Sequence, residues 1–461
     1  MAEQIRALTG LRAVAAIGVV ISHSGVPASL PEHLTKIAKW GYIGVPMFFM
    51  LSGVVLAYNY PSLQGWEGRR TVRFYIARIA RVMPLYWVMI AYCAAYYWIL
   101  GRDQHEWALL QNIFAVQTWS GDLAVAQGHY NGPGWSIGVE MFFYLLFPFL
   151  IPVVARLARR HGPRGLIILI GAMTLIVFAL WLAFYLTGRA DLPAADPGSA
   201  HRWLYRNPLC YLPLFVCGMA IAFLIPHTAG WSTRRHHTIQ AFVFCYVFGL
   251  AAFRGTGPGW GTASFGLLFV VPFTLALISL ASGRGWMAGL LSTTPMVRLG
   301  VASYALYITH RWLIHPMPTT EYIKTGQGLV PYAALLITVA LLLLIAEGAH
   351  QYIEEPARRW LVKITKPLTL SGTDKAAPIP AAPDSPSRAG SDSSPTGLDS
   401  SSAGPDSSLL AGSGSSSPAR SGSSSAEPDS SSPAGSDSSS PAGPGSAFPV
   451  APDSRPFRLG V

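Results

Sequence analysis

Residues 166–186 read LIILIGAMTLIVFALWLAFYL, a run of 21 residues without a charged side chain. A helix needs about 20 apolar residues to cross the hydrocarbon core of a bilayer, so this run predicts a membrane span. The sequence therefore favours an all-α, polytopic membrane helix bundle of about ten transmembrane helices. Nine further apolar runs of similar length are centred near Ala16, Met50, Ala91, Leu145, Val216, Phe244, Val271, Leu306 and Leu341.

The overall composition supports the same fold class. Apolar residues make up 51% of the 461 residues, and charged residues only 12%. Soluble domains carry about 25% charged residues, so much of the apolar surface is expected to face lipid. A cleaved signal peptide is an alternative for the first run, but Arg12 lies inside its apolar period and many further runs follow.

Two regions of different composition divide the chain. We expect residues 1–366 to form the membrane domain and residues 367–461 to form a disordered cytoplasmic tail. The tail repeats Ser, Pro, Gly, Ala and Asp and cannot bury enough apolar area to offset its chain entropy. The tail holds 9 acidic and 5 basic residues and so has a net charge of −4. Because the whole chain has a net charge of +11, the membrane domain has a net charge of +15.

The orientation follows from the distribution of Lys and Arg, which favour cytoplasmic loops. With the N-terminus inside, 17 basic residues fall on the cytoplasmic side, within residues 69–81, 156–164, 234–235, 284–298 and 358–366. The outer loops hold 8, namely Lys36, Lys39, Arg102, Arg189, Arg202, Arg206, Arg254 and Lys324. The asymmetry predicts that both termini are cytoplasmic.

Arg12 and His23 are ionisable residues on the first apolar run. Eleven steps of 100° come within about 20° of three full turns, so both side chains project from one face, about 16 Å apart along the axis. Ionisable groups inside a membrane usually mark function and must face protein or water. The alternative is snorkelling of Arg12 to the inner headgroups and of His23 to the outer ones.

Arg78 and Arg81 lie three residues apart and are therefore neighbours on one helix face at the cytoplasmic edge. Guanidinium groups bind phosphate with bidentate geometry, so the pair is a candidate phosphate site. Anchoring of the helix end by the positive-inside effect is the alternative.

Acidic and imidazole side chains also occur in later apolar runs. Glu140 is a candidate for a paired or pKa-tuned carboxylate, and Tyr144 lies one turn further on the same face. An ion pair that only holds helices together is the alternative for Glu140. His310 lies within the ninth run, where it is either a site residue or a hydrogen-bonded helix contact. Glu354 and Glu355, late in the last run, are expected at the cytoplasmic surface, and Glu347 is expected to be more buried.

The cysteines give no sign of a metal site or a disulfide framework. All four lie in apolar runs without CxxC spacing, so we expect neither a zinc site nor disulfides. They are Cys93, Cys210, Cys217 and Cys245.

Taken together, these motifs resemble acyltransferase family 3, a family of membrane enzymes that acylate surface glycans, lipids and some macrolides. Leu8–Arg12 through His23 carries the family's Arg-x10-His spacing. Further matching stretches follow in family order over residues 5–360. They are Gly41–Gly53, Arg78–Tyr86, Trp135–Tyr144, Leu299–His310 and Glu355–Pro356.

The resemblance implies an O-acyltransferase of the plasma membrane. It would move an acyl group, with acetyl expected, from acyl-CoA to a hydroxyl of a sugar, glycan, lipid or macrolide. The implied partners are acyl-CoA, this acceptor and the lipid bilayer, with no metal and no nucleic acid. Because CoA is phosphorylated, we expect Arg12, Arg78 and Arg81 to bind the donor.

Acyl transfer also needs a base and a group that stabilises the oxyanion. We expect His23 to deprotonate the acceptor hydroxyl, since neutral imidazole is the usual base near pH 7. Glu140 would orient or charge-balance His23. Tyr144 or His310 would donate to the oxyanion or position the acceptor. A covalent acyl-histidine intermediate is the alternative to direct transfer.

Two other function classes also fit a polytopic chain. A transporter or flippase for a glycan or lipid-linked substrate would use intramembrane Arg, His and Glu too, but internal repeats are absent from this sequence. A membrane anchor for the Ser-rich tail would leave the charges at membrane depth unexplained.

Overall fold

The computed structural model describes residues 2–102, 105–126, 130–253, 259–314, 317 and 319–369. All of them belong to the first of two units of the chain, Met1–Ala382. The predicted tail lies outside the described residues, except that the last helix continues to Thr369. The division of the chain near residue 366 otherwise stays a prediction.

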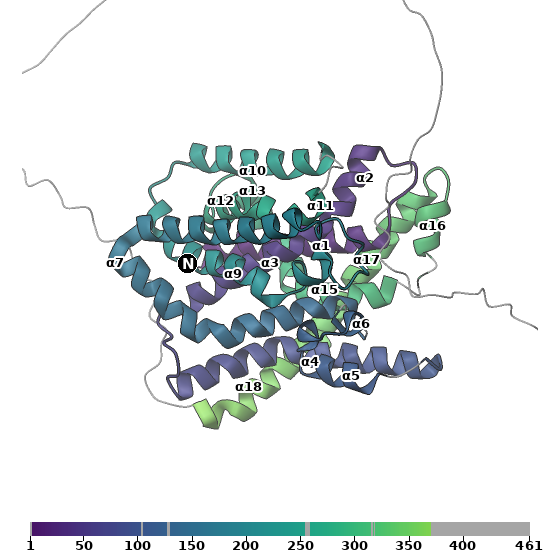
Figure 1. The fold of residues 1–461 in the computed structure, drawn as a ribbon, viewed down its shortest axis with the longest axis horizontal. Coiled ribbons are helices and arrows are strands. Elements are labelled where there is room, and N and C mark those ends of the chain that lie inside the picture. The colour runs from purple at the N-terminus through teal and green to yellow at the C-terminus, as the bar shows by residue number, and fades with distance from the viewer. Residues whose placement is uncertain are drawn as a thin grey trace, which may run out of the picture. The chain divides into compact units, whose positions relative to one another are not determined.

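The described residues form helices joined by loops and short turns, with no strand among them (Figure 1). The α-helices are α1 (Ala2–Ser24), α2 (Glu32–Lys39), α3 (Gly44–Asn59), α4 (Arg69–Ile99), α5 (Glu106–Ile113), α6 (Leu123–Ala126), α7 (Trp135–Leu186), α8 (Ala200–Trp203), α9 (Pro208–Leu224), α10 (Thr233–Phe253), α11 (Trp260–Ala263), α12 (Val270–Ala281), α13 (Trp286–Leu291), α14 (Thr294–Val301), α15 (Ser303–Ile314), α16 (Thr319–Thr325), α17 (Val330–Ala349) and α18 (Glu355–Thr369). The 3₁₀ turns are η1 (Trp40–Ile43), η2 (Gln117–Trp119), η3 (Gly132–Gly134), η4 (Ile225–Thr228) and η5 (Leu267–Phe269), and η6 (His350–Glu354) is a π-helical turn.

The all-α membrane fold predicted from the sequence is confirmed. Within the described residues, seven helical stretches are long and apolar enough to cross a membrane. All ten predicted centres lie in helices, and two of them share α7, which is interrupted at Gly162 (φ 56°, ψ −149°). The count of ten spans stays a prediction. The seven stretches are Arg6–Ser24, Glu32–Asn59, Arg69–Ile99, Gly132–Leu186, Pro208–Thr228, Thr233–Phe253 and Val330–Thr365.

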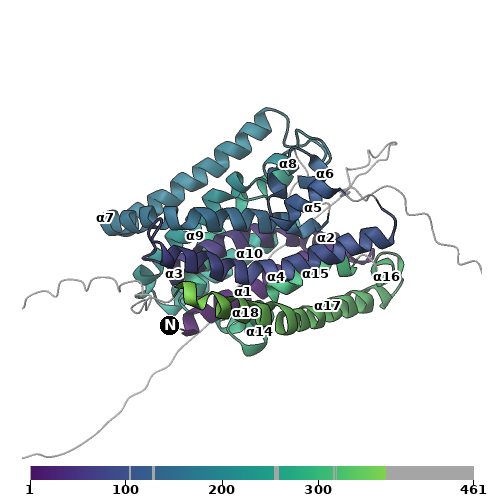
Figure 2. The same cartoon turned by 90° about the horizontal axis from the view of Figure 1, so that it is seen from below.

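Helix α1 packs against α3, α13, α14 and α15 (Figures 1 and 2). Glycine also allows η1 to approach α1 closely. A Cβ atom added at Gly41 would lie 1.8 Å from the backbone oxygen of Gly18 on α1. Such small-residue contacts let helix backbones approach closely in membranes. The packing fixes α1, which carries both Arg12 and His23, against its neighbours.

Helices α3 and α9 cross in the same way. A Cβ at Gly53 would lie 2.2 Å from the Phe215 oxygen, and one at Gly218 would lie 2.0 Å from the Met50 oxygen. Any larger side chain at either position would force the two helices apart. The pair of glycines therefore sets the distance between the two helices.

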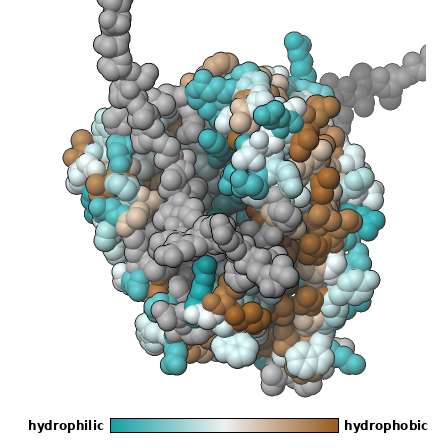
Figure 3. Space-filling view, turned by 90° about the vertical axis from the view of Figure 1, so that its right-hand side faces the viewer, coloured by the Kyte–Doolittle hydropathy of each residue, from teal (hydrophilic) through white to brown (hydrophobic). Residues whose placement is uncertain are grey.

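Large apolar side chains cover the outside of several helices. Ile168 and Leu175 on α7 are 71% and 64% exposed, and Leu336 and Leu344 on α17 are 71% and 70% exposed. Figure 3 shows apolar surface beside polar groups on one face of the molecule. Exposed apolar area of this extent fits contact with lipid.

We expect Gly218→Ala to destabilise the protein, because the added methyl group collides with the Met50 backbone. Overpacking of this kind costs about 1–3 kcal/mol. Thermal unfolding in detergent should show a lower midpoint for Gly218→Ala. Gly249→Ala on α10 is the matched control, since a Cβ there meets nothing within 4 Å. Equal midpoints for the two variants would show that the α3–α9 crossing can relax.

Candidate functional site

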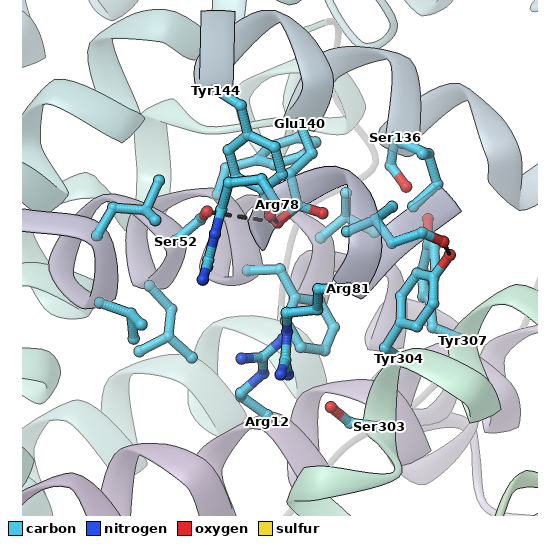
Figure 4. A pocket seen from close by; sticks show the side chains of 18 of the residues that line it. Arg12, Ser52, Arg78, Arg81, Ser136, Glu140, Tyr144, Ser303, Tyr304 and Tyr307 are labelled. Carbon is cyan, nitrogen blue, oxygen red and sulfur yellow. Dashed lines mark hydrogen bonds between the residues drawn. The ribbon is translucent and has the colours of Figure 1, made fainter. Parts of the chain in front are cut away.

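A cavity of about 480 Å³ lies between five helices, α1, α3, α4, α7 and α15 (Figure 4). Its polar lining comes from each of them. Arg12 projects from α1, Ser52 from α3, and Arg78 and Arg81 from successive turns of α4. Further lining residues are Ser136, Glu140 and Tyr144 from α7 and Ser303, Tyr304 and Tyr307 from α15.

The cavity carries an excess of positive charge. Three guanidiniums, of Arg12, Arg78 and Arg81, and one carboxylate, of Glu140, line it, which leaves a net charge of +2. Figure 4 places the Arg12 and Arg81 guanidiniums beside each other. Like charges in a low-dielectric site repel strongly unless an anion lies between them. The arrangement fits a multiply charged anionic ligand.

Two of these arginines also have unused hydrogen-bonding capacity. Among the described residues, the buried Nε atoms of Arg12 and Arg78 have no hydrogen-bond partner. The Arg78 guanidinium lies 5.6 Å from the centre of the Tyr60 ring, which stabilises its charge but offers no acceptor. Buried donors are normally satisfied, so these atoms point to a missing acceptor.

The carboxylate of Glu140 is held within α7 and by α3. Its Oε1 atom accepts a hydrogen bond from the Tyr144 hydroxyl one turn away and another, of 3.4 Å, from the Ser52 hydroxyl. The i,i+4 spacing places Glu140 and Tyr144 on one face, as expected from the sequence. The Tyr144 hydroxyl thus donates to Glu140 in this structure.

His23 and His310 form a second group, and His23 lies about three turns further along α1 than Arg12. The Nε2 atom of His310 lies 3.2 Å from Nδ1 of His23, and the ring centres are 5.1 Å apart. His310 is completely buried. Neither histidine is among the described residues that line the cavity.

Backbone carbonyls fix the tautomers of this pair. Nδ1 of His310 lies 2.6 Å from the Tyr307 oxygen, and Nδ1 of His23 lies 2.9 Å from the Val19 oxygen. A carbonyl only accepts, so both Nδ1 atoms carry protons when the rings are neutral. The single Nδ1 proton of His23 is then shared between the Val19 oxygen and Nε2 of His310, which both accept from it. In this tautomer the ring lone pair of His23 is on Nε2.

Tyr307 joins the two groups. Its side chain lines the cavity, while its backbone oxygen accepts the proton of His310 Nδ1. Its hydroxyl lies 3.4 Å from the Pro133 oxygen, to which it donates. Helix α15 packs along α1, so the cavity and the histidine pair occupy successive positions along the same two helices.

The structure therefore divides the predicted site residues into two sets. Arg12, Arg78, Arg81, Glu140 and Tyr144 share the cavity. His23 and His310 form the hydrogen-bonded pair, and the roles assigned to all seven from the sequence stay predictions.

Sequence reasoning missed several residues of the cavity wall. Ser52, Tyr304 and Tyr307 stood inside the matching stretches without being singled out. The sequence signal that could have identified them is a hydroxyl side chain on an otherwise apolar helix. The surface position expected for Glu354 is wrong, since it is 1% exposed and its Oε2 lies 3.0 Å from Nδ1 of His350. The π-helical turn η6 brings it inside.

Comparison with known proteins gives consistent matches. A family model described as an acyltransferase domain matches residues 5–347. O-acetyltransferase OatA of Staphylococcus aureus is 26% identical over 388 residues, covering 76% of this chain and 57% of the relative. Acyltransferase MdmB of Streptomyces mycarofaciens is 27% identical over 410 residues, covering 83% of this chain and 97% of the relative. No solved structure matches the chain.

Inorganic pyrophosphate should stabilise the wild-type protein, because it can neutralise the guanidiniums of the cavity. At a concentration of 100 times its Kd, the gain would be about 2.7 kcal/mol. Arg81→Gln should lose most of this gain, as measured by thermal unfolding in detergent. Arg298→Gln is the control, because the Arg298 side chain is 69% exposed and pairs with Glu347. Equal stabilisation of both variants would contradict an anion site in the cavity.

Proposed function

Since this chain belongs to acyltransferase family 3, we propose that it is a membrane O-acyltransferase. It would transfer an acyl group, with acetyl favoured, from acyl-CoA to a hydroxyl of a sugar, glycan, lipid or glycosylated natural product. One of its relatives is named an O-acetyltransferase and another an acyltransferase. The chain spans 57% of the length of OatA, so the activity of that whole protein enters only as a proposal. The observation that carries the proposal is a cationic cavity and a hydrogen-bonded histidine pair that lie on the same two helices, α1 and α15.

We assign acyl-CoA as the acyl donor because of the positive charge of the cavity. The cavity has a net charge of +2 and holds orphaned buried donors on Arg12 and Arg78. CoA carries phosphates, which guanidiniums bind with charge-assisted hydrogen bonds. Arg78 and Arg81 would hold the phosphates, and Arg12 would stand where the pantetheine arm passes toward His23.

The orientation proposed from the Lys and Arg distribution agrees with this assignment. Arg12 lies nearer the N-terminus of α1 than His23 does. If the N-terminus is cytoplasmic, the arginine cavity opens toward the compartment that contains acyl-CoA. His23 then lies toward the outer side of the plasma membrane, where the acceptor would enter.

His23 is the proposed general base. Its Nε2 atom would take the proton of the acceptor hydroxyl while the hydroxyl oxygen bonds to the thioester carbon. The carbon–sulfur bond then breaks, and the imidazolium returns the proton to the CoA thiolate. The products are an ester and free CoA, and direct transfer needs no other reactant.

The structure suggests a more specific role for His310 than the sequence did. Its Nε2 accepts from His23 Nδ1, and its own Nδ1 is committed to the Tyr307 carbonyl. We therefore assign His310 as a positioning residue that holds His23 in its reactive tautomer. We assign Tyr144 the role of holding the Glu140 carboxylate, to which its hydroxyl donates a hydrogen bond.

Replacement of the base should abolish acyl transfer. We expect His23→Ala to reduce the rate of labelled acetyl transfer by about 10²–10⁴-fold, the usual contribution of a general base. His33→Ala is the matched control, because His33 lies exposed on α2. The assay follows consumption of labelled acetyl-CoA by purified protein with candidate acceptors.

A native rate in a folded His23→Ala protein would exclude His23 as the base. Wild-type protein that moves a glycan or lipid-linked substrate across vesicles but never consumes acetyl-CoA would be a transporter or flippase instead.

Loss of a cavity arginine should weaken donor binding selectively. A hydrogen bond to a charged group contributes about 1.5–3 kcal/mol, so Arg78→Ala and Arg81→Ala should each raise the Kd of acetyl-CoA roughly 10- to 150-fold. The KM for the acceptor should change much less. Isothermal titration and acceptor kinetics separate the two effects. Equal losses toward donor and acceptor would rule out a phosphate site here.

A further inference from the structure

Arg206 is a buried cation outside the cavity. It lies between α8 and α9 and is 8% exposed. Among the described residues, its Nε and Nη1 atoms have no hydrogen-bond partner. Its guanidinium carbon lies 5.8 Å from the centre of the Trp135 ring. Burial is the main cause that lowers the pKa of Arg206 to about 10, so the guanidinium stays charged at neutral pH.

The surroundings of Arg206 add positive rather than negative charge. Arg311, which follows His310 on α15, and Arg202 on α8 both act electrostatically on it. Among the residues that the structure describes, no carboxylate forms an ion pair with any of the three. Arg202 donates to the Ser120 oxygen, yet its Nη1 also lacks a partner. A buried cation without a partner is costly, so a missing anion is indicated.

This cluster lies near the histidine pair. The charges of Arg206 and Arg311 both act on His23. The stem of Arg311 lies against Gly132, because a Cβ there would be 3.0 Å from the Arg311 Cδ atom. Tyr307 and Ser136 both donate to the Pro133 oxygen next to Gly132. Arg206, between α8 and α9, and Arg311, on α15, therefore both lie near the reactive histidine, and neither lines the donor cavity.

We propose that Arg206 and Arg311 bind an acidic group of the acceptor, a carboxylate or a phosphate, and so hold its hydroxyl at His23. The acceptor class would then be an anionic hydroxyl compound, such as an acidic or phosphorylated sugar. This inference rests on the proposed O-acyltransferase function. A guanidinium with two open donors matches the fork geometry of carboxylate and phosphate oxygens.

The test compares acceptors that differ only in charge. Purified full-length protein receives labelled acetyl-CoA with methyl glucuronide, with glucose 1-phosphate or with methyl glucoside. The wild type should have a higher kcat/KM for the acidic sugars. Arg206→Gln should reduce that preference by about 10- to 150-fold, the value of one charge-assisted hydrogen bond, and Arg206→Lys should retain part of it. Arg102→Gln, in an exposed loop, is the control.

Binding is measured in parallel, because these sugars need not be turned over. The two acidic sugars should raise the thermal midpoint of the wild type but not of Arg206→Gln, whereas methyl glucoside should raise neither. Preference for only one of the two acids identifies which anion the site takes.

Two results would overturn the inference. One is a wild type that is stabilised equally, or not at all, by charged and neutral sugars. The other is an Arg206→Gln variant that binds the acidic sugars as the wild type does. The proposed function fails separately: acidic sugars would still stabilise the wild type while acetyl-CoA was never consumed.

Discussion

Buried positive charge without a matching carboxylate is the constraint on which this structure depends. A guanidinium inside a membrane bundle must face protein or water, and it must find an acceptor. Arg12, Arg78 and Arg81 face one carboxylate in a shared cavity. The helices around them supply hydroxyls and aromatic rings rather than more acids. The bundle therefore keeps an open, cationic space at its centre, which a closely packed apolar core would have filled.

The framework that holds this space depends on close contacts between helix backbones. Gly41 lets η1 approach α1, and Gly53 with Gly218 brings α3 against α9. These contacts position α1 so that Arg12 reaches the cavity. Farther along the same helix, His23 meets His310 of α15. The guanidinium of Arg12 and the imidazole of His23 thus lie about three turns apart on one helix. This spacing suits a donor that has phosphates at one end and a reactive thioester at the other.

Hydrogen bonding gives the histidine pair a direction. Each Nδ1 proton points at an acceptor, so in the neutral tautomer the ring lone pair of His23 is on Nε2. Buried Arg206, between α8 and α9, and partly buried Arg311, on α15, act on the same imidazole. Two cationic regions therefore flank the place where we propose that acyl transfer occurs. One is suited to the donor, and the other is suited to an acidic acceptor.

The sequence by itself determined the helical membrane fold and the spacing of side chains on each helix, because both follow from local periodicity and hydrophobic length. Arg12 with His23 and Glu140 with Tyr144 share faces for that reason. Only the tertiary structure decided which helices meet. It joined His23 to His310, 287 residues away, and buried Arg206, which the sequence had shown only as an outer basic residue. Those partnerships depend on helix crossings and loop paths, and no local spacing encodes them.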